Sequence, residues 1–97
     1  MTIGTYENFA PHINQTFSVD LGDSAVEMTL TQAVKGKPQA WQGVRKEPFF
    51  LLFKCAKPVV LPQRLYRFES TGFGRMDIFI VPVGREPDGV VYQAVFN

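Results

Sequence analysis

The most chemically distinctive stretch of the chain is a basic segment around its one tryptophan. The segment contains Lys35, Lys37, Trp41, Arg45 and Lys46. Lysine and arginine side chains pair with phosphates and an indole ring stacks on bases, so this composition is typical of proteins that bind single-stranded nucleic acid. The alternative interpretation is that the four charges are solvated and that Trp41 covers one end of the core. We treat these five residues as a candidate binding site.

Charge is distributed unevenly along the 97 residues, although the formal net charge is only +1. Residues 1–34 carry four carboxylates and no lysine or arginine, whereas residues 35–75 carry nine of the ten basic side chains and two carboxylates. Such asymmetry predicts a polar partner or self-association through opposite charges. The near-neutral total argues against strong binding to nucleic acid, which is the less favoured partner.

Three further arginines, Arg64, Arg67 and Arg75, lie in or beside predicted strands. A strand arginine usually pairs with a carboxylate across the sheet or extends its charged end to water. We expect that behaviour of all three. A phosphate or carboxylate site built from them is the less favoured alternative.

Residues suited to catalysis or metal binding are scarce. The chain has one histidine, His12, and one cysteine, Cys55, and neither lies in a recognised catalytic signature. A structural zinc site needs four cysteine or histidine ligands, usually as closely spaced pairs. We expect His12 to be an ordinary surface or capping residue, and we expect no catalytic residue, metal or cofactor. The sequence therefore predicts a protein that is not an enzyme.

Most apolar residues alternate with polar ones, which is the pattern of half-buried β-strands. Six strands are predicted, at residues 17–21, 26–31, 49–53, 65–68, 76–83 and 90–96. Turn sequences follow the first strand, at Gly22-Asp23-Ser24, and the fifth, where residues 84–89 contain Pro-Asp-Gly. The prediction is a single all-β domain over residues 1–97, with about six antiparallel strands in a barrel or a sandwich.

A short helical turn is expected before the first strand, over residues 5–10, with Thr5 as its N-cap. Pro11 disfavours continuation of an α-helix through the residue before it. We expect Phe9 and Ile13 to pack this turn onto one end of the sheet.

The strands at residues 49–53 and 76–83 are apolar on both faces, so neither suits a sheet with one solvated face. Such strands require a closed barrel, a sandwich or burial against another chain. Five phenylalanines are expected in the core: Phe49, Phe50, Phe53, Phe79 and Phe96.

Several short motifs are spread over nearly the whole chain. They are Phe9-Ala10-Pro11, Gln15-Thr16-Phe17, Phe50-Leu51-Leu52-Phe53, Leu61-Pro62-Gln63 followed by Tyr66, Phe79-Ile80-Val81-Pro82-Val83-Gly84 and the terminal Tyr92-Gln93-Ala94-Val95-Phe96-Asn97. Together they resemble an uncharacterised family of small bacterial all-β proteins, a domain of unknown function. The chain departs from the family pattern at Asn14, where glycine is expected, and at Glu69-Ser70, where His-Pro is common.

The resemblance implies no known activity. It implies that some members are encoded beside proteins similar to phage tail-collar or tail-fibre components, which favours a role in an assembly.

These observations favour a non-enzymatic structural or protein-interaction domain, as a component or accessory of a phage-tail-like assembly. It is expected to self-associate as an oligomer or to bind another protein. The alternative is a small ligand- or single-stranded nucleic-acid-binding β-barrel that uses Trp41 and the basic segment over residues 35–46. One cysteine, no recognisable export signal and no membrane-spanning run favour a cytoplasmic protein with no membrane partner.

Overall fold

A computed structural model describes residues 5–36, 48–57 and 60–96. The chain begins with a short α-helix, α1 (Tyr6–Phe9), which continues as a 3₁₀ turn, η1 (Ala10–His12). Six strands follow: β1 (Thr16–Asp20), β2 (Ala25–Lys35), β3 (Phe49–Cys55), β4 (Arg64–Ser70), β5 (Gly74–Glu86) and β6 (Gly89–Phe96). The predicted all-β fold with a short N-terminal helical turn is confirmed.

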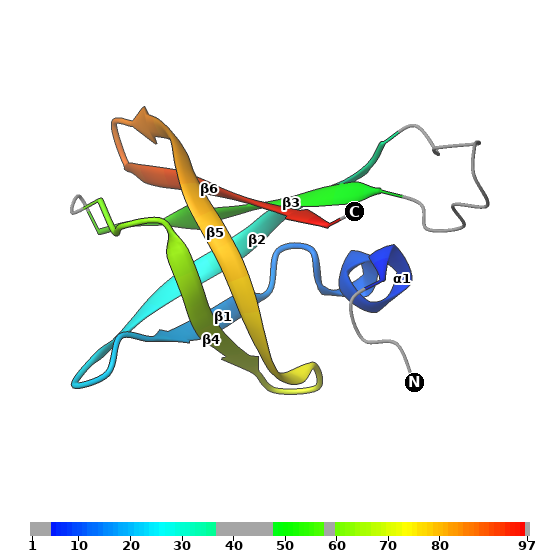
Figure 1. Cartoon of the computed structure of the whole chain (residues 1–97), viewed down its shortest axis with the longest axis horizontal. Helices are drawn as coiled ribbons and strands as arrows, with labels where there is room; N and C mark the ends of the chain where they lie inside the picture. Colours follow the sequence, from blue (N-terminus) through cyan, green and yellow to red (C-terminus); the bar gives the residue numbers. More distant parts are fainter. Residues whose placement is uncertain (1–4, 37–47, 58–59, 97) are drawn as a thin grey trace.

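The six strands form one closed barrel in the order β1-β2-β3-β6-β5-β4, and each neighbouring pair is antiparallel (Figure 1). Of the two predicted architectures, the barrel is the one formed. The contact between β4 and β1 closes the circle. It is the shortest ladder, with three residue pairs centred on Val19 and Phe68, whereas seven pairs join β4 to β5.

Both predicted hairpins are present. Between β1 and β2, the Gly22 N–H donates a hydrogen bond to the Asp20 carboxylate (2.8 Å), and Gly22 has φ = 103°, a conformation that favours glycine. Between β5 and β6 the turn is shorter than the predicted segment 84–89. β5 continues to Glu86 and β6 begins at Gly89, so only two residues separate the strands.

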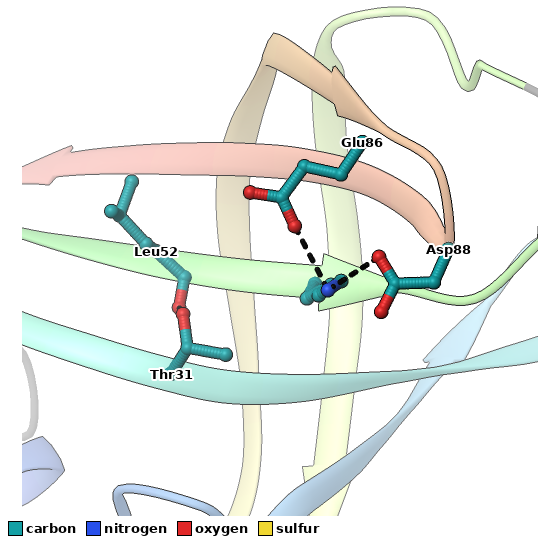
Figure 2. Close-up of polar contacts among 5 residues, drawn as sticks. Thr31, Leu52, Glu86 and Asp88 are labelled. Carbon is teal, nitrogen blue, oxygen red and sulfur yellow. Dashed lines mark hydrogen bonds and ion pairs between the residues drawn. The ribbon is translucent and has the colours of Figure 1, made fainter.

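Two bulges interrupt the strand ladders. In β2 the register shifts between Leu30 and Gln32, which leaves Thr31 as the extra residue. Its hydroxyl donates a hydrogen bond to the Leu52 carbonyl (3.1 Å; Figure 2). In β5 the register shifts just after Pro82, a residue without an N–H that strands tolerate at bulges. Bulges bend a strand and increase its twist, which helps a sheet to close on itself.

The barrel interior is filled by apolar side chains from alternate positions of every strand. The buried hydrophobic residues are Phe9, Phe17, Val19, Met28, Leu30, Phe49, Leu51, Phe53, Cys55, Tyr66, Phe68, Ile78, Ile80, Val90, Tyr92 and Ala94. The expected core positions of Phe49 and Phe53 are therefore confirmed, while Phe50 and Phe96 are half-buried.

Helix α1 and turn η1 cover one end of the barrel (Figure 1). Phe9 is fully buried there, and its ring lies against those of Phe49, Phe73 and Phe96, at centroid distances of 5.1 to 6.0 Å. The expectation for Phe9 is thus confirmed. The expectation for Ile13 is wrong, because its side chain is 37% exposed beyond the end of η1.

Helix α1 begins after Thr5 and ends at Phe9, two residues before Pro11. Thr5 occupies the N-cap, but its hydroxyl donates to the Asn8 side-chain oxygen (2.6 Å) and caps no backbone N–H. After Phe9 the chain tightens into the 3₁₀ turn that contains Pro11.

Two tyrosines hold the segment before β4, away from α1 in Figure 1. The Leu61 N–H donates a hydrogen bond to the Tyr92 phenol oxygen (2.9 Å), and the Tyr66 hydroxyl donates to the Pro62 carbonyl (2.7 Å). Burial raises the pKa of Tyr92 above its usual value, which keeps the phenol protonated and neutral. These bonds give both tyrosines a role, because each holds a backbone group of this segment.

Candidate functional site

The basic segment predicted from the sequence lies mainly outside the described residues. Lys37, Trp41, Arg45 and Lys46 all do, and Lys35 is the last residue of β2. The Lys35 ammonium lies 3.9 Å from the Glu7 carboxylate and 5.0 Å from the centre of the Tyr6 ring.

These contacts direct Lys35 toward α1. Its charge is partly balanced by Glu7, and a lysine over an aromatic face is a favourable contact. In the described part of the candidate site, the basic side chain therefore helps to hold the helix against β2.

The three strand arginines differ in their surroundings. Arg64 lies over the Tyr66 ring (5.3 Å to its centre), and the Arg67 guanidinium lies 3.8 Å from the Asp77 carboxylate on β5. Pairing with a carboxylate is therefore confirmed for Arg67. Arg75 makes no ion pair with any residue that the structure describes. It lines a shallow, open depression together with Arg67, Met76 and Asp77.

A second, more enclosed cavity lies where α1 and η1 meet the turn between β4 and β5. Its volume is about 160 Å³, and it is lined by Asn8, His12, Gly72, Phe73 and Arg75. Arg75 borders both this cavity and the shallow depression. The cavity thus gathers a guanidinium, an imidazole, a carboxamide and an aromatic ring in a small volume.

A chain of hydrogen bonds fixes the orientation of His12. The Gln15 amide nitrogen donates to the Thr71 carbonyl (2.7 Å) and to the Ser70 hydroxyl, which in turn donates to the Thr16 carbonyl. The Gln15 side-chain oxygen therefore faces His12 Nδ1, at 2.7 Å. Because that oxygen can only accept, Nδ1 must carry a proton and donate it.

The sequence suggested an ordinary surface or capping residue at His12, whereas the structure shows a partly enclosed imidazole held by Gln15. The imidazole is half-buried. It is nearly perpendicular to the Phe73 ring, and the centres of the two rings are 5.3 Å apart. The second ring nitrogen, Nε2, has no hydrogen-bond partner in the described parts of the chain. Nothing local signals this arrangement, because His12 and Arg75 are far apart in the sequence and meet only when the barrel closes.

The outer face of β4 and β5 carries large apolar side chains. Leu65 and Phe79 lie opposite each other in the register and are 56% and 49% exposed. The expectation that Phe79 is in the core is wrong, because its neighbours Ile78 and Ile80 point inward and successive strand residues alternate between faces. On β6, the next strand, Val95 is 59% exposed on the same outer surface.

An ion cluster lies on the outside of the barrel beside the β5–β6 turn. The Lys54 ammonium of β3 lies 2.8 Å from both the Glu86 and the Asp88 carboxylates (Figure 2). Hydrogen bonds to Asp88 and Glu86 raise the pKa of Lys54, and the bond from Lys54 lowers the pKa of Asp88. The cluster secures the turn to β3, and its two carboxylates and one ammonium leave one net negative charge there.

Among residues 5–36, 48–57 and 60–96, no three His, Cys, Asp or Glu side chains are grouped so that they could hold a metal ion. In the same ranges, no helix has both the length and the apolar character needed to cross a lipid bilayer.

The fold and these surfaces define a small, closed, six-stranded antiparallel β-barrel protein with an N-terminal helical cover. The chain belongs to a family described as a domain of unknown function, DUF6916, which it matches over residues 4–96. No curated protein and no solved structure matches the chain.

One of the two departures from the expected family pattern has a clear structural basis. Asn14 has φ = 76°, in the left-handed region that glycine, and next to it asparagine, adopts most readily. Its N–H donates to the Leu30 carbonyl (2.6 Å). The substitution of asparagine for glycine therefore retains the turn that leads into β1. The other departure places Ser70 in the hydrogen-bond chain that orients His12.

Proposed function

We propose that this domain acts through protein–protein contact and that it forms a two-fold dimer through the outer face of β4 and β5. The observation that carries the proposal is the exposed pair of Leu65 and Phe79 on adjacent strands. Large apolar side chains that remain in solvent on neighbouring strands mark interaction surfaces more often than ordinary solvated faces.

Strands β1 and β2, which follow β4 around the closed barrel, provide a contrast within the same molecule. At the corresponding outer positions of β1 and β2, Ser18 lies opposite Glu27, and both are exposed. That side has the polar composition expected of a sheet that faces water. The apolar pair on β4 and β5 thus has no counterpart at these positions of β1 and β2, although Val95 on β6 is also exposed.

The charges beside the apolar pair support a second copy of the chain as the partner. Arg67 lies opposite Asp77 in the register, one outward position along the strands from Leu65 and Phe79. A two-fold axis running between β4 and β5, parallel to both, places β4 of one copy over β5 of the other. Leu65 then faces Phe79 of the partner subunit, and Arg67 faces Asp77 of the partner subunit.

In such a contact each apolar side chain meets an apolar side chain and each charge meets its opposite. The face is therefore complementary to itself, as a two-fold interface requires. The loose Arg67–Asp77 pair within one chain, at 3.8 Å, leaves both groups free to engage the partner. The proposal is consistent with the assembly role implied by the family resemblance, but its support is this face alone.

Light scattering on a sizing column, at low and at high salt, tests whether the face is used. We expect a dimer in both conditions, since the centre of the contact is apolar. Leu65→Asp and Phe79→Asp are expected to yield monomers, whereas Gln32→Asp, on the exposed side of β2, leaves the dimer intact. A wild-type monomer across a wide dilution series would refute the proposed function.

Charge reversal tests the geometry. Arg67→Glu gives each copy two negative groups at this pair, and Asp77→Arg gives each copy two positive groups, so each variant alone should repel itself and be mainly monomeric. An equimolar mixture should recover the dimer, because opposite charges then face each other across the axis. A mixture that remains monomeric would refute this arrangement.

A further inference from the structure

The cavity between η1 and the β4–β5 turn lies outside the apolar pair that the proposed dimer uses. Its volume of about 160 Å³ is below the range of about 300–1,000 Å³ typical of sites for drug-sized ligands. A single small ion, or one group of a larger molecule, is the size of ligand that such a cavity takes.

The cavity has a source of positive charge that the fold does not neutralise. Arg75 lines it and makes no ion pair with the described residues. Glu69 lies opposite Arg75 in the β4–β5 register, yet no guanidinium nitrogen of Arg75 lies within 4 Å of the Glu69 carboxylate oxygens. A guanidinium presents paired N–H donors to the oxygens of a phosphate or carboxylate, so an anion is the complementary ligand.

The other polar groups are oriented by bonds made away from the ligand. The Asn8 side-chain oxygen accepts from the Thr5 hydroxyl (2.6 Å), which leaves the Asn8 amide nitrogen as a donor. His12 Nδ1 is committed to Gln15, which leaves Nε2. That nitrogen either accepts a proton from a ligand hydroxyl or, when protonated, donates to a ligand oxygen.

We propose that this cavity binds a phosphate group. The second ionisation of a phosphate ester has a pKa of about 6. Near neutral pH a fraction of phosphate groups therefore bears both charged oxygens and an exchangeable proton. The charged oxygens match the donors of Arg75 and Asn8, and the exchangeable proton is shared with His12 Nε2. Sulfate matches only the donors. The ligand is free phosphate or the phosphoryl group of a larger molecule.

Titration of the ¹⁵N-labelled protein with inorganic phosphate, followed by amide chemical shifts, tests the site. We expect saturable shifts centred on residues 72, 73 and 75 and on η1. Arg75→Ala should weaken binding about tenfold or more, because it removes the only guanidinium that lines the cavity among the described residues. Arg85→Ala, an equal change of charge near the far end of β5, should leave binding unchanged.

The variant His12→Asn distinguishes the roles of the two ring nitrogens. An asparagine amide can still donate to Gln15 in place of Nδ1, but it offers nothing in place of Nε2. We expect the wild type to prefer phosphate to sulfate and His12→Asn to lose that preference. Glu69→Gln, which removes the nearest carboxylate in the register, should strengthen binding. Unfolding curves for all variants establish that they remain folded.

The outcomes decide between clear alternatives. Shifts that do not saturate, or equal weakening by Arg75→Ala and Arg85→Ala, would mean non-specific attraction and would overturn the proposal. Equal binding of phosphate and sulfate by the wild type would overturn the role of His12. Tighter binding of methyl phosphate than of inorganic phosphate would identify the phosphoryl group of a larger molecule as the ligand, and the reverse order would identify the free anion.

Discussion

The phenol oxygen of Tyr92 accepts a hydrogen bond from the backbone N–H of Leu61, at 2.9 Å, and so ties the last strand to the segment that precedes β4. The Tyr92 side chain is fully buried, so no water can readily replace its hydroxyl. Tyr92→Phe would leave the Leu61 N–H without its partner. We expect a loss of about 1–2 kcal/mol in the free energy of unfolding, measured with urea.

Amide hydrogen exchange locates this effect. The Leu61 amide should exchange faster in Tyr92→Phe than the lower global stability alone explains. Tyr66→Phe also removes a hydroxyl from this segment, but it leaves the Leu61 donor in place. An unchanged Leu61 exchange rate in Tyr92→Phe would contradict the assigned bond.

Phe9 is predicted to be the main anchor of the helical cover. Its side chain is fully buried against aromatic rings from β3, β6 and the β4–β5 turn. Replacing a buried phenylalanine by alanine typically costs about 3–5 kcal/mol. Phe9→Ala should therefore lower the free energy of unfolding by that amount, whereas Ile13→Ala, at a partly exposed site, should change it by less than about 1 kcal/mol. Similar losses for both variants would contradict the packing of α1.

The limits of inference from the sequence are clearest in the strand at residues 76–83. The long apolar run correctly predicted a strand there. Because nearly every position in it is apolar, hydrophobicity alone could not show which residues face inward. The inward faces of Ile78 and Ile80 place Phe79 outside, and the bulge after Pro82 shifts the later positions. Neither fact is local to the sequence, because both depend on how β5 pairs with β4 and β6.

The ion cluster of Lys54, Glu86 and Asp88 makes the free energy of unfolding depend on pH. The hydrogen bond from Lys54 lowers the pKa of Asp88, so the stabilisation from this carboxylate is present above its unfolded value near 3.8 and is lost as the pH falls through the lower folded value. The pKa of Lys54 is raised, so its contribution is present below 10.5 and is lost as the pH rises further.

We therefore expect Asp88→Asn to lower the melting temperature slightly near neutral pH and to have no effect in strong acid, where the wild-type carboxyl is also neutral. The effect is small because the groups are exposed. Thermal unfolding from pH 2 to pH 8 measures it. Asp23→Asn, in the β1–β2 turn and outside the described ion pairs, is the matched control. A difference between wild type and Asp88→Asn that persists at pH 2 would contradict the assigned cause.

Gly89, the first residue of β6, is required by a close approach of two backbones. It has φ = 156°, and a Cβ atom there would collide with the Cys55 carbonyl oxygen. Gly89→Ala should destabilise the protein by about 2 kcal/mol or more, because two strand backbones must separate. Gly84→Ala, where a Cβ would meet nothing within 4 Å, should cost less than about 1 kcal/mol in the same urea measurement. Equal costs would show that the strand contact is not the cause.

The candidate sites were harder to infer than the fold. Arg75 belonged to a set of arginines for which an anion site was the less favoured interpretation, and His12 was expected to be an ordinary surface or capping residue. Their meeting depends on closure of the barrel and on the turn at Asn14, which directs Gln15 toward Ser70 and Thr71. Asn14, which adopts the left-handed backbone conformation more readily than most residues, is the one local signal of that turn.

Closure of the sheet has a consequence for how copies of this protein can combine. Each of the six strands is already hydrogen-bonded to two neighbours, so an added chain finds no open strand edge on the barrel to extend. Contact between copies must be made through side chains on the outside, and a face that pairs with itself is used up when two copies meet. Association through β4 and β5 is therefore self-terminating: it gives pairs of defined size and no fibres.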